Sequence, residues 1–271
     1  MVCCENKRSE TIYEKDRIEN KGGETMRSGN PSLTNNTFKS YAGSADASDQ
    51  MTIQGTVNKT FILLVFIIIS AIFTWTQYFA GQNVSPYITI GVIGSLIVAL
   101  VTIFVKRMAP VLSPIYAMLE GLVIGGVSAI YESQFQGITF MAVSLTFSIL
   151  LGLLLIYKSG LIKVTHNFRL GVAAATLGVL LTYLLNLILG FFGIQVPFIH
   201  ETGTLGIIVS IVIVFIAALN LVLDFDFIER GAELGAPKYM EWYGAFGIMV
   251  TLVWLYLEIL RLLYKVLANR N

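Results

Sequence analysis

Four carboxylates stand inside long apolar stretches of this sequence: Glu120, Asp224, Asp226 and Glu258. An ionised carboxylate in hydrocarbon costs several kcal/mol, so each must face protein or water and find a proton or a partner. These four are therefore the candidate residues for proton or cation chemistry.

The local surroundings of two of them differ. Glu120 has no basic residue three or four positions away, so it either holds a proton or pairs with another helix, in a functional or a structural role. Asp226 precedes Arg230 by four residues, the favourable order for a helical ion pair, and a structural role is the stronger interpretation.

Asp224 is the first choice for a functional carboxylate. It lies about 200° around a helix from Asp226 and shares a face with Asn220, which forms a short polar stripe without a cation. Glu258 has Arg261 three positions on, so a plain ion pair would explain it. The alternative is that Glu258 faces Asp224 across a helix bundle.

Such a pair would share one proton and titrate as a coupled unit, and its oxygens would also suit Ca²⁺. One geometric objection stands. Asp224 lies 11 residues before Gly235 and Glu258 lies 21 after Pro237, an offset of about 15 Å between straight helices. An extra helical stretch outside the membrane, formed by the polar run 238–241, would absorb it.

The elements that must position these residues are membrane-spanning helices. The chain is 55% hydrophobic and 13% charged, far from the composition of a soluble domain. A bilayer core of roughly 30 Å requires about 20 apolar residues per helix. Seven stretches qualify, at residues 61–80, 87–105, 111–131, 138–157, 170–193, 205–227 and 243–263. The sequence therefore predicts an all-α membrane protein of seven transmembrane helices.

Residues 1–59 differ in kind, with eight Lys/Arg, eight Asp/Glu and no apolar period. We expect a disordered cytoplasmic tail there and the membrane domain at 60–271. The tail and the even-numbered loops hold fifteen basic residues and the other loops none, which places the N-terminus in the cytoplasm. Seven spans then put the C-terminus outside, yet Arg261, Lys265 and Arg270 oppose this, so a last helix that does not fully cross stays open.

Other motifs carry little chemistry. Cys3 and Cys4 are adjacent and form neither a redox pair nor a metal-ligand spacing, so they are incidental or lipidated. His166 and His200 fall on opposite sides of the membrane. No phosphate-binding loop, nucleophile elbow or zinc-protease motif occurs, so an enzyme, a cofactor or a nucleic-acid partner is not expected. Gly121 and Gly125 have the spacing that lets two helix backbones approach closely.

Three stretches resemble the Bax inhibitor-1 (transmembrane Bax-inhibitor-motif) family, in its bacterial branch. They are Lys106-Arg107 leading into 115–121 and Gly125-Gly126, then 220–228, and then 256–260. The likeness covers about residues 61–263. Residues 224–261 are the most specific part, and resemble a subgroup with an extended sixth loop.

The resemblance implies a fold in which the seventh helix is central, and a pH-sensitive calcium leak gated by paired acids on helices six and seven. By motif position Asp224 and Glu258 match that pair, with Glu replacing the second Asp. Lys106 or Arg107 matches the basic residue that latches the closed state in such proteins. The bacterial cytoplasmic membrane is the expected location.

Two functions follow as hypotheses. The first is a proton-gated cation leak, for Ca²⁺, with Asp224 and Glu258 as the switch, Glu120 on the path and Lys106 or Arg107 as the latch. The second is a regulator that binds a membrane protease or another membrane protein without transport, through its tail. Both require the lipid bilayer as a partner.

Overall fold

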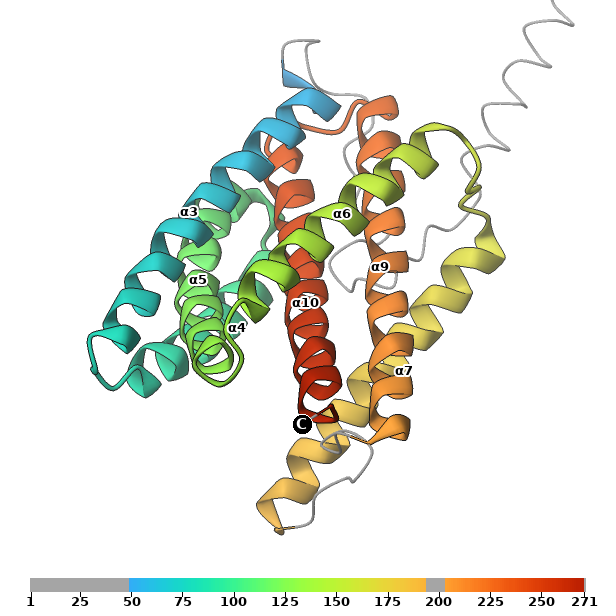
Figure 1. The fold of residues 1–271 in the computed structure, drawn as a ribbon. Coiled ribbons are helices and arrows are strands. Elements are labelled where there is room, and N and C mark those ends of the chain that lie inside the picture. The colour runs from blue at the N-terminus through green and yellow to red at the C-terminus, as the bar shows by residue number, and fades with distance from the viewer. Residues whose placement is uncertain (1–48, 194–202, 271) are drawn as a thin grey trace, which may run out of the picture.

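The computed structural model describes residues 49–193 and 203–270, so the predicted tail through residue 48, with Cys3 and Cys4, and His200 lie outside the described residues. Within these ranges seven helices are long and apolar enough to cross a membrane (Figure 1). They are α3 (Ile53–Phe79), α4 (Ser85–Phe104), α5 (Ala109–Gln134), α6 (Ile138–Lys158), α7 (His166–Phe191), α9 (Thr204–Glu233) and α10 (Met240–Ala268), with a short 3-10 helix η2 (Lys106–Met108) before α5. The predicted all-α, seven-helix architecture is confirmed.

Several helices extend beyond the apolar stretches. α3 begins at Ile53, inside the predicted tail, and α9 continues to Glu233. The 29 residues of α10 give about 43 Å at 1.5 Å per residue, more than the roughly 30 Å of a bilayer core. The last helix is therefore long enough to cross fully, and Lys265 near its end is buried against α9 rather than solvated.

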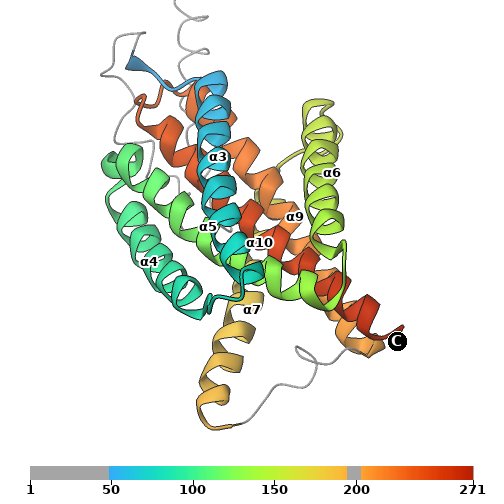
Figure 2. The same cartoon turned by 60° about the vertical axis from the view of Figure 1, so that its left-hand side comes forward.

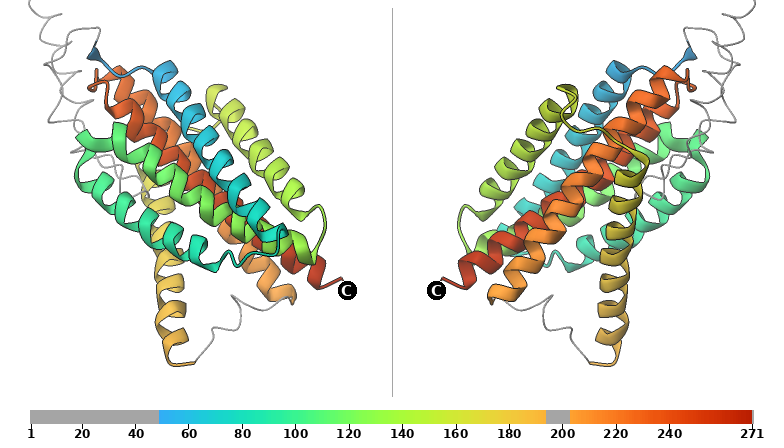
Figure 3. Two further views of the ribbon diagram at one scale, coloured as in Figure 1. Left: turned by 90° about the vertical axis from the view of Figure 1, so that its left-hand side faces the viewer. Right: turned by 90° about the vertical axis from the view of Figure 1, so that its right-hand side faces the viewer.

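The last helix occupies the centre of the bundle. In its most apolar window 67% of the residues of α10 are buried, the highest share of the seven helices. α3, α5, α6 and α9 pack directly against it, and Figures 1 and 3 show α10 running between them. The predicted central position of the seventh helix is confirmed.

Close contact between α3 and α5 depends on two glycines. A Cβ built on Gly121 would lie 2.5 Å from the carbonyl oxygen of Ile67, and one on Gly125 would lie 2.2 Å from that of Ala71. Both separations are far below van der Waals contact, so no side chain fits at either position. The small-residue spacing in the sequence therefore marks a helix interface, as predicted.

α7 is the least covered helix. Only 6% of its most apolar window is buried, and the helix packs mainly against α9. Figures 2 and 3 show α7 crossing the direction of the other helices, with its C-terminal part projecting away from them. Apolar packing within the chain therefore contributes little to the position of α7.

The connection between α9 and α10 is shorter than the sequence suggested. Gly235 has φ +64°, a left-handed conformation that ends α9, and α10 starts at Met240 without an intervening helical stretch. Glu241, in the polar run, is buried within the protein and accepts hydrogen bonds from Lys59 and from the backbone and hydroxyl of Thr52. The polar run is thus part of the bundle because its acid is paired with α3.

Candidate functional site

Three polar residues of α7 face the centre of the bundle at intervals of seven. Arg169, Thr176 and Tyr183 lie two helical turns apart, so they share one face of an otherwise apolar helix. Together they extend about 21 Å along the axis at 1.5 Å per residue. We call these three residues the α7 stripe, and each of them contacts a polar residue of α9 or α10.

At one end of the stripe, Arg169 meets Asp226. The Arg169 Nη2 lies 3.3 Å from Asp226 Oδ2, and Arg230 Nε lies 3.1 Å from Oδ1 of the same carboxylate. Arg169 is 2% exposed, which makes this a buried guanidinium. The ion pair predicted between Asp226 and Arg230 is confirmed, and α7 supplies a second cation. Glu229, which accepts a hydrogen bond from Tyr157, adds a further acid nearby.

In the middle of the stripe, Thr176 meets Asn220. The Asn220 Nδ2 donates to Thr176 Oγ1 at 2.7 Å and to the backbone oxygen of Ile216 at 2.9 Å. Asn220 thus points inward as predicted, but toward α7. Asp224, also buried, is two positions from Asp226 and hence about 200° around α9 from it. Asp226 is a carboxylate of α9 that forms an ion pair with α7.

At the far end of the stripe, Tyr183 meets Glu258 of the central helix. The Tyr183 hydroxyl donates to Glu258 Oε1 at 2.6 Å and accepts from Arg261 Nη1 at 2.7 Å. Arg261 Nη1 also lies 3.1 Å from Glu258 Oε1, which confirms the ion pair expected from their spacing. Glu258, 2% exposed, is therefore neutralised inside the bundle.

The relative register of α9 and α10 separates the two acids that were expected to pair. Gly244 lies against Ile228, and Lys265 donates to Ser210 and to the carbonyl of Gly206. Since the helices are antiparallel, these contacts place residue 224 level with residue 248.

Glu258 is ten residues further along α10, or about 15 Å. The short α9–α10 connection leaves the offset in place, so Asp224 and Glu258 do not share a proton by direct contact in this arrangement. Nor can both ligate one Ca²⁺, whose oxygen ligands lie at about 2.3–2.6 Å. Among the described residues, no group of three or more His, Cys, Asp or Glu side chains could hold a metal ion.

Glu120 belongs to another part of the bundle. Its side chain lies close to Tyr116, one turn earlier on α5, and to Ser95 on α4. Ser95 is thus a polar neighbour of Glu120 from another helix, and the two alternatives for Glu120, a bound proton or a partner on another helix, stay predictions. Glu120 faces α4 and is not brought together with the α7 stripe.

The two basic residues predicted as the latch lie in η2, just before α5. The Lys106 Nζ is 5.8 Å from the ring centroid of Tyr243 on α10, and Arg107 is exposed. Asp226 forms ion pairs with Arg169 and Arg230. A latching role for Lys106 or Arg107 remains a prediction.

Sequence reasoning missed the α7 stripe altogether. Arg169 was counted only as a loop charge that fixes orientation, and Thr176 and Tyr183 were not singled out. A signal does exist, because polar residues at intervals of seven in a helix made mostly of Leu, Ala and Gly mark one face. That signal identifies the face but not its partners on α9 and α10.

The fold and the site define a polytopic α-helical membrane protein with paired charges inside its bundle. The family model described as Bax inhibitor 1 like matches residues 30–268. This chain therefore belongs to the Bax inhibitor 1 like family, as the resemblance in its sequence predicted. Neither the curated proteins nor the solved structures contain a match to it.

Proposed function

We propose that this protein is a proton-gated cation leak in which α7 is the gate. The observation that carries the proposal is the α7 stripe. Its three residues contact the bundle, and at two of these contacts the partner is a carboxylate. α7 has the smallest buried share of the seven helices, and an ion pair and hydrogen bonds join it to its neighbours. The proposal replaces one shared proton with two separate ion pairs.

Protonation would act on both ends of the stripe. A neutral Asp226 no longer forms an ion pair with Arg169, and a neutral Glu258 no longer attracts Arg261 or accepts a charge-assisted bond from Tyr183. Each loss lowers the stability of the docked position of α7. Acidification therefore shifts the population toward an undocked α7.

An undocked α7 would leave oxygen atoms exposed along α9 and α10. Asp226, Asn220 and Glu258 are spread over about 18 Å of helix axis, counted from their levels on α9. Carboxylate and amide oxygens are the ligands that hard cations such as Ca²⁺ prefer. With the N-terminus in the cytoplasm of a bacterial cell, as the basic loops favour, Asp226 would mark the cytoplasmic end of this path.

The test is Ca²⁺ entry into dye-loaded proteoliposomes between about pH 6 and pH 8, a range reached by buried carboxyl groups. Wild type should leak faster at the acid end. Asp226→Asn and Glu258→Gln, which mimic the protonated state, should leak at pH 8 and lose most of the pH dependence. Glu132→Gln is the matched control, because Glu132 caps the start of α6 through Gly137 and Thr139, outside the stripe.

No wild-type flux above empty vesicles at any pH would refute the leak. The alternative is a membrane regulator that binds a membrane protease. Because α3 begins at Ile53 and Lys59 pairs with Glu241, its test is deletion of residues 1–48 rather than of the whole predicted tail. Loss of protease capture by that deletion would favour the regulator, and unchanged capture would count against it.

A further inference from the structure

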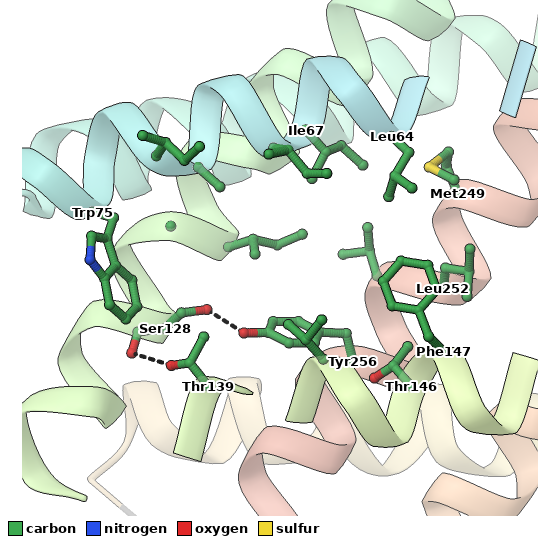
Figure 4. Close-up of a pocket in the computed structure, with 17 residues that line it drawn as sticks. Leu64, Ile67, Trp75, Ser128, Thr139, Thr146, Phe147, Met249, Leu252 and Tyr256 are labelled. Carbon is green, nitrogen blue, oxygen red and sulfur yellow. Dashed lines mark hydrogen bonds between the residues drawn. The ribbon is translucent and has the colours of Figure 1, made fainter. Parts of the chain in front are cut away.

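A cavity of about 370 Å³ lies between α3, α5, α6 and α10 (Figure 4). This volume is within the range of small-molecule binding sites, roughly 300–1,000 Å³. Tyr256 of α10 lines the cavity, whereas Glu258, two positions on, points to the opposite side of that helix. The cavity is therefore separate from the α7 stripe and plays no part in the proposed gate.

The mouth of the cavity opens sideways between α3 and α6. Ile72 on α3 and Phe147 on α6 line the cavity and are also exposed on the molecular surface. Its floor is formed by Met249 and Tyr256, which are buried. All four residues belong to membrane-spanning helices, so the mouth faces the interior of the bilayer rather than water.

The polar groups around the cavity are already engaged with protein atoms. The hydroxyls of Ser128 and Tyr256 lie 2.5 Å apart, and Thr139 Oγ1 donates to the backbone oxygen of Ser128 at 3.3 Å. Thr146 Oγ1 donates to the carbonyl of Ala142 within its own helix. No charged side chain is among the lining residues. A buried water molecule needs several polar partners, and these engaged groups offer it few hydrogen bonds.

We propose that the acyl chain of a membrane phospholipid occupies this cavity, entering between α3 and α6. An empty apolar cavity leaves its whole lining without partner atoms, so an apolar occupant is favoured. Lipid chains are the hydrocarbon that adjoins the mouth in a bilayer. The Trp75 indole, partly exposed near the end of α3, lines the cavity at the depth where headgroups begin. The chain enters from that leaflet, with its headgroup outside.

Trp75 also supplies the probe. In full-length protein carrying Trp242→Phe and Trp254→Phe, Trp75 is the remaining tryptophan of the three in the chain. Bromine atoms on a lipid chain quench indole fluorescence on contact. Titration of this protein in micelles with a phospholipid brominated on its chains should give saturable quenching at about one lipid per protein.

Filling the cavity should remove this binding. Thr146→Phe places a ring in the cavity and should weaken the saturable quenching at least tenfold, whereas Ser148→Phe, on the exposed side of α6, should leave it unchanged. Val143→Phe at the mouth gives the second test where Thr146→Phe fails to fold.

Equal quenching in all variants, or quenching that rises linearly without saturation, would overturn the proposal. So would saturable quenching by a brominated free fatty acid but not by the phospholipid. A stable dimer in gel filtration that shows no saturable quenching would indicate that a second copy of the chain covers the cavity. This result would also overturn the lipid proposal.

Discussion

Replacing Tyr183 with Phe tests the gate with the smallest change in structure. The substitution removes a hydroxyl that donates to Glu258 at 2.6 Å and accepts from Arg261 at 2.7 Å. It keeps the aromatic ring, whose centroid lies 5.3 Å from the Arg261 guanidinium carbon. Only the hydrogen bonds that tie α7 to α10 are lost.

The free energy of docking that Tyr183→Phe removes depends on the partners that Glu258 keeps. Hydrogen bonds to charged groups contribute about 1.5–3 kcal/mol in soluble proteins, whereas side-chain bonds between membrane helices average about 0.6 kcal/mol. Glu258 keeps its ion pair with Arg261, so the Tyr183→Phe change should weaken docking by about 1 kcal/mol. That figure corresponds to about a fivefold larger undocked population of α7.

The assay is Ca²⁺ flux at pH 8, where the docked form should dominate and flux should rise about fivefold. At the acid end of the range the proposed gate is already open in wild type, so the flux through the variant and through wild type should converge there. Tyr78→Phe is the control, because its hydroxyl pairs with Ser133 between α3 and α5. Unchanged flux at pH 8, or an equal rise in the control, would refute the reasoning.

Three further predictions concern other contacts. In a chain without its native cysteines, Thr176→Cys and Asn220→Cys can be bridged with a short reducible thiol crosslinker. The bridge should abolish acid-stimulated flux, and its reduction should restore that flux. Acid-stimulated flux through the bridged protein would exclude movement of α7. Gly125→Ala should destabilise the bundle by about 1–3 kcal/mol through overpacking, seen as a lower thermal unfolding midpoint, while Gly152→Ala, with open space around it, should not. Glu241→Gln should lower that midpoint because it breaks a buried ion pair to α3, an effect of about 3–5 kcal/mol; a midpoint equal to wild type would show that the pair is not stabilising.

The number and type of helices could be predicted from the sequence because apolar length alone sets them. Helix ends could not, since paired charges extend a helix past its apolar stretch. Lys59 and Glu241 each lie outside the predicted spans, and in the structure each is inside a helix and pairs with the other.

The candidate site was predicted only in part. The sequence identified Glu258 and its pairing with Arg261, because three positions along a helix bring two side chains together. The register between α9 and α10 depends on where the turn at Gly235 ends α9 and on where α10 begins. Residue spacing within a single helix carries no information about either. The same limit hid Arg169, whose partner is 57 positions away in the sequence.

The charges buried along α10 also bear on how the chain enters the membrane. Glu241, Glu258, Arg261 and Lys265 lie within this one span, and a charged residue at the centre of a lone helix costs about 2.5–3.5 kcal/mol during insertion. Glu258 and Arg261 pair with each other, and the other partners of these charges are on α3, α7 and α9, all made earlier in synthesis. α10 should therefore remain poorly inserted until those helices are assembled around it, which makes completion of the bundle the last step of biogenesis.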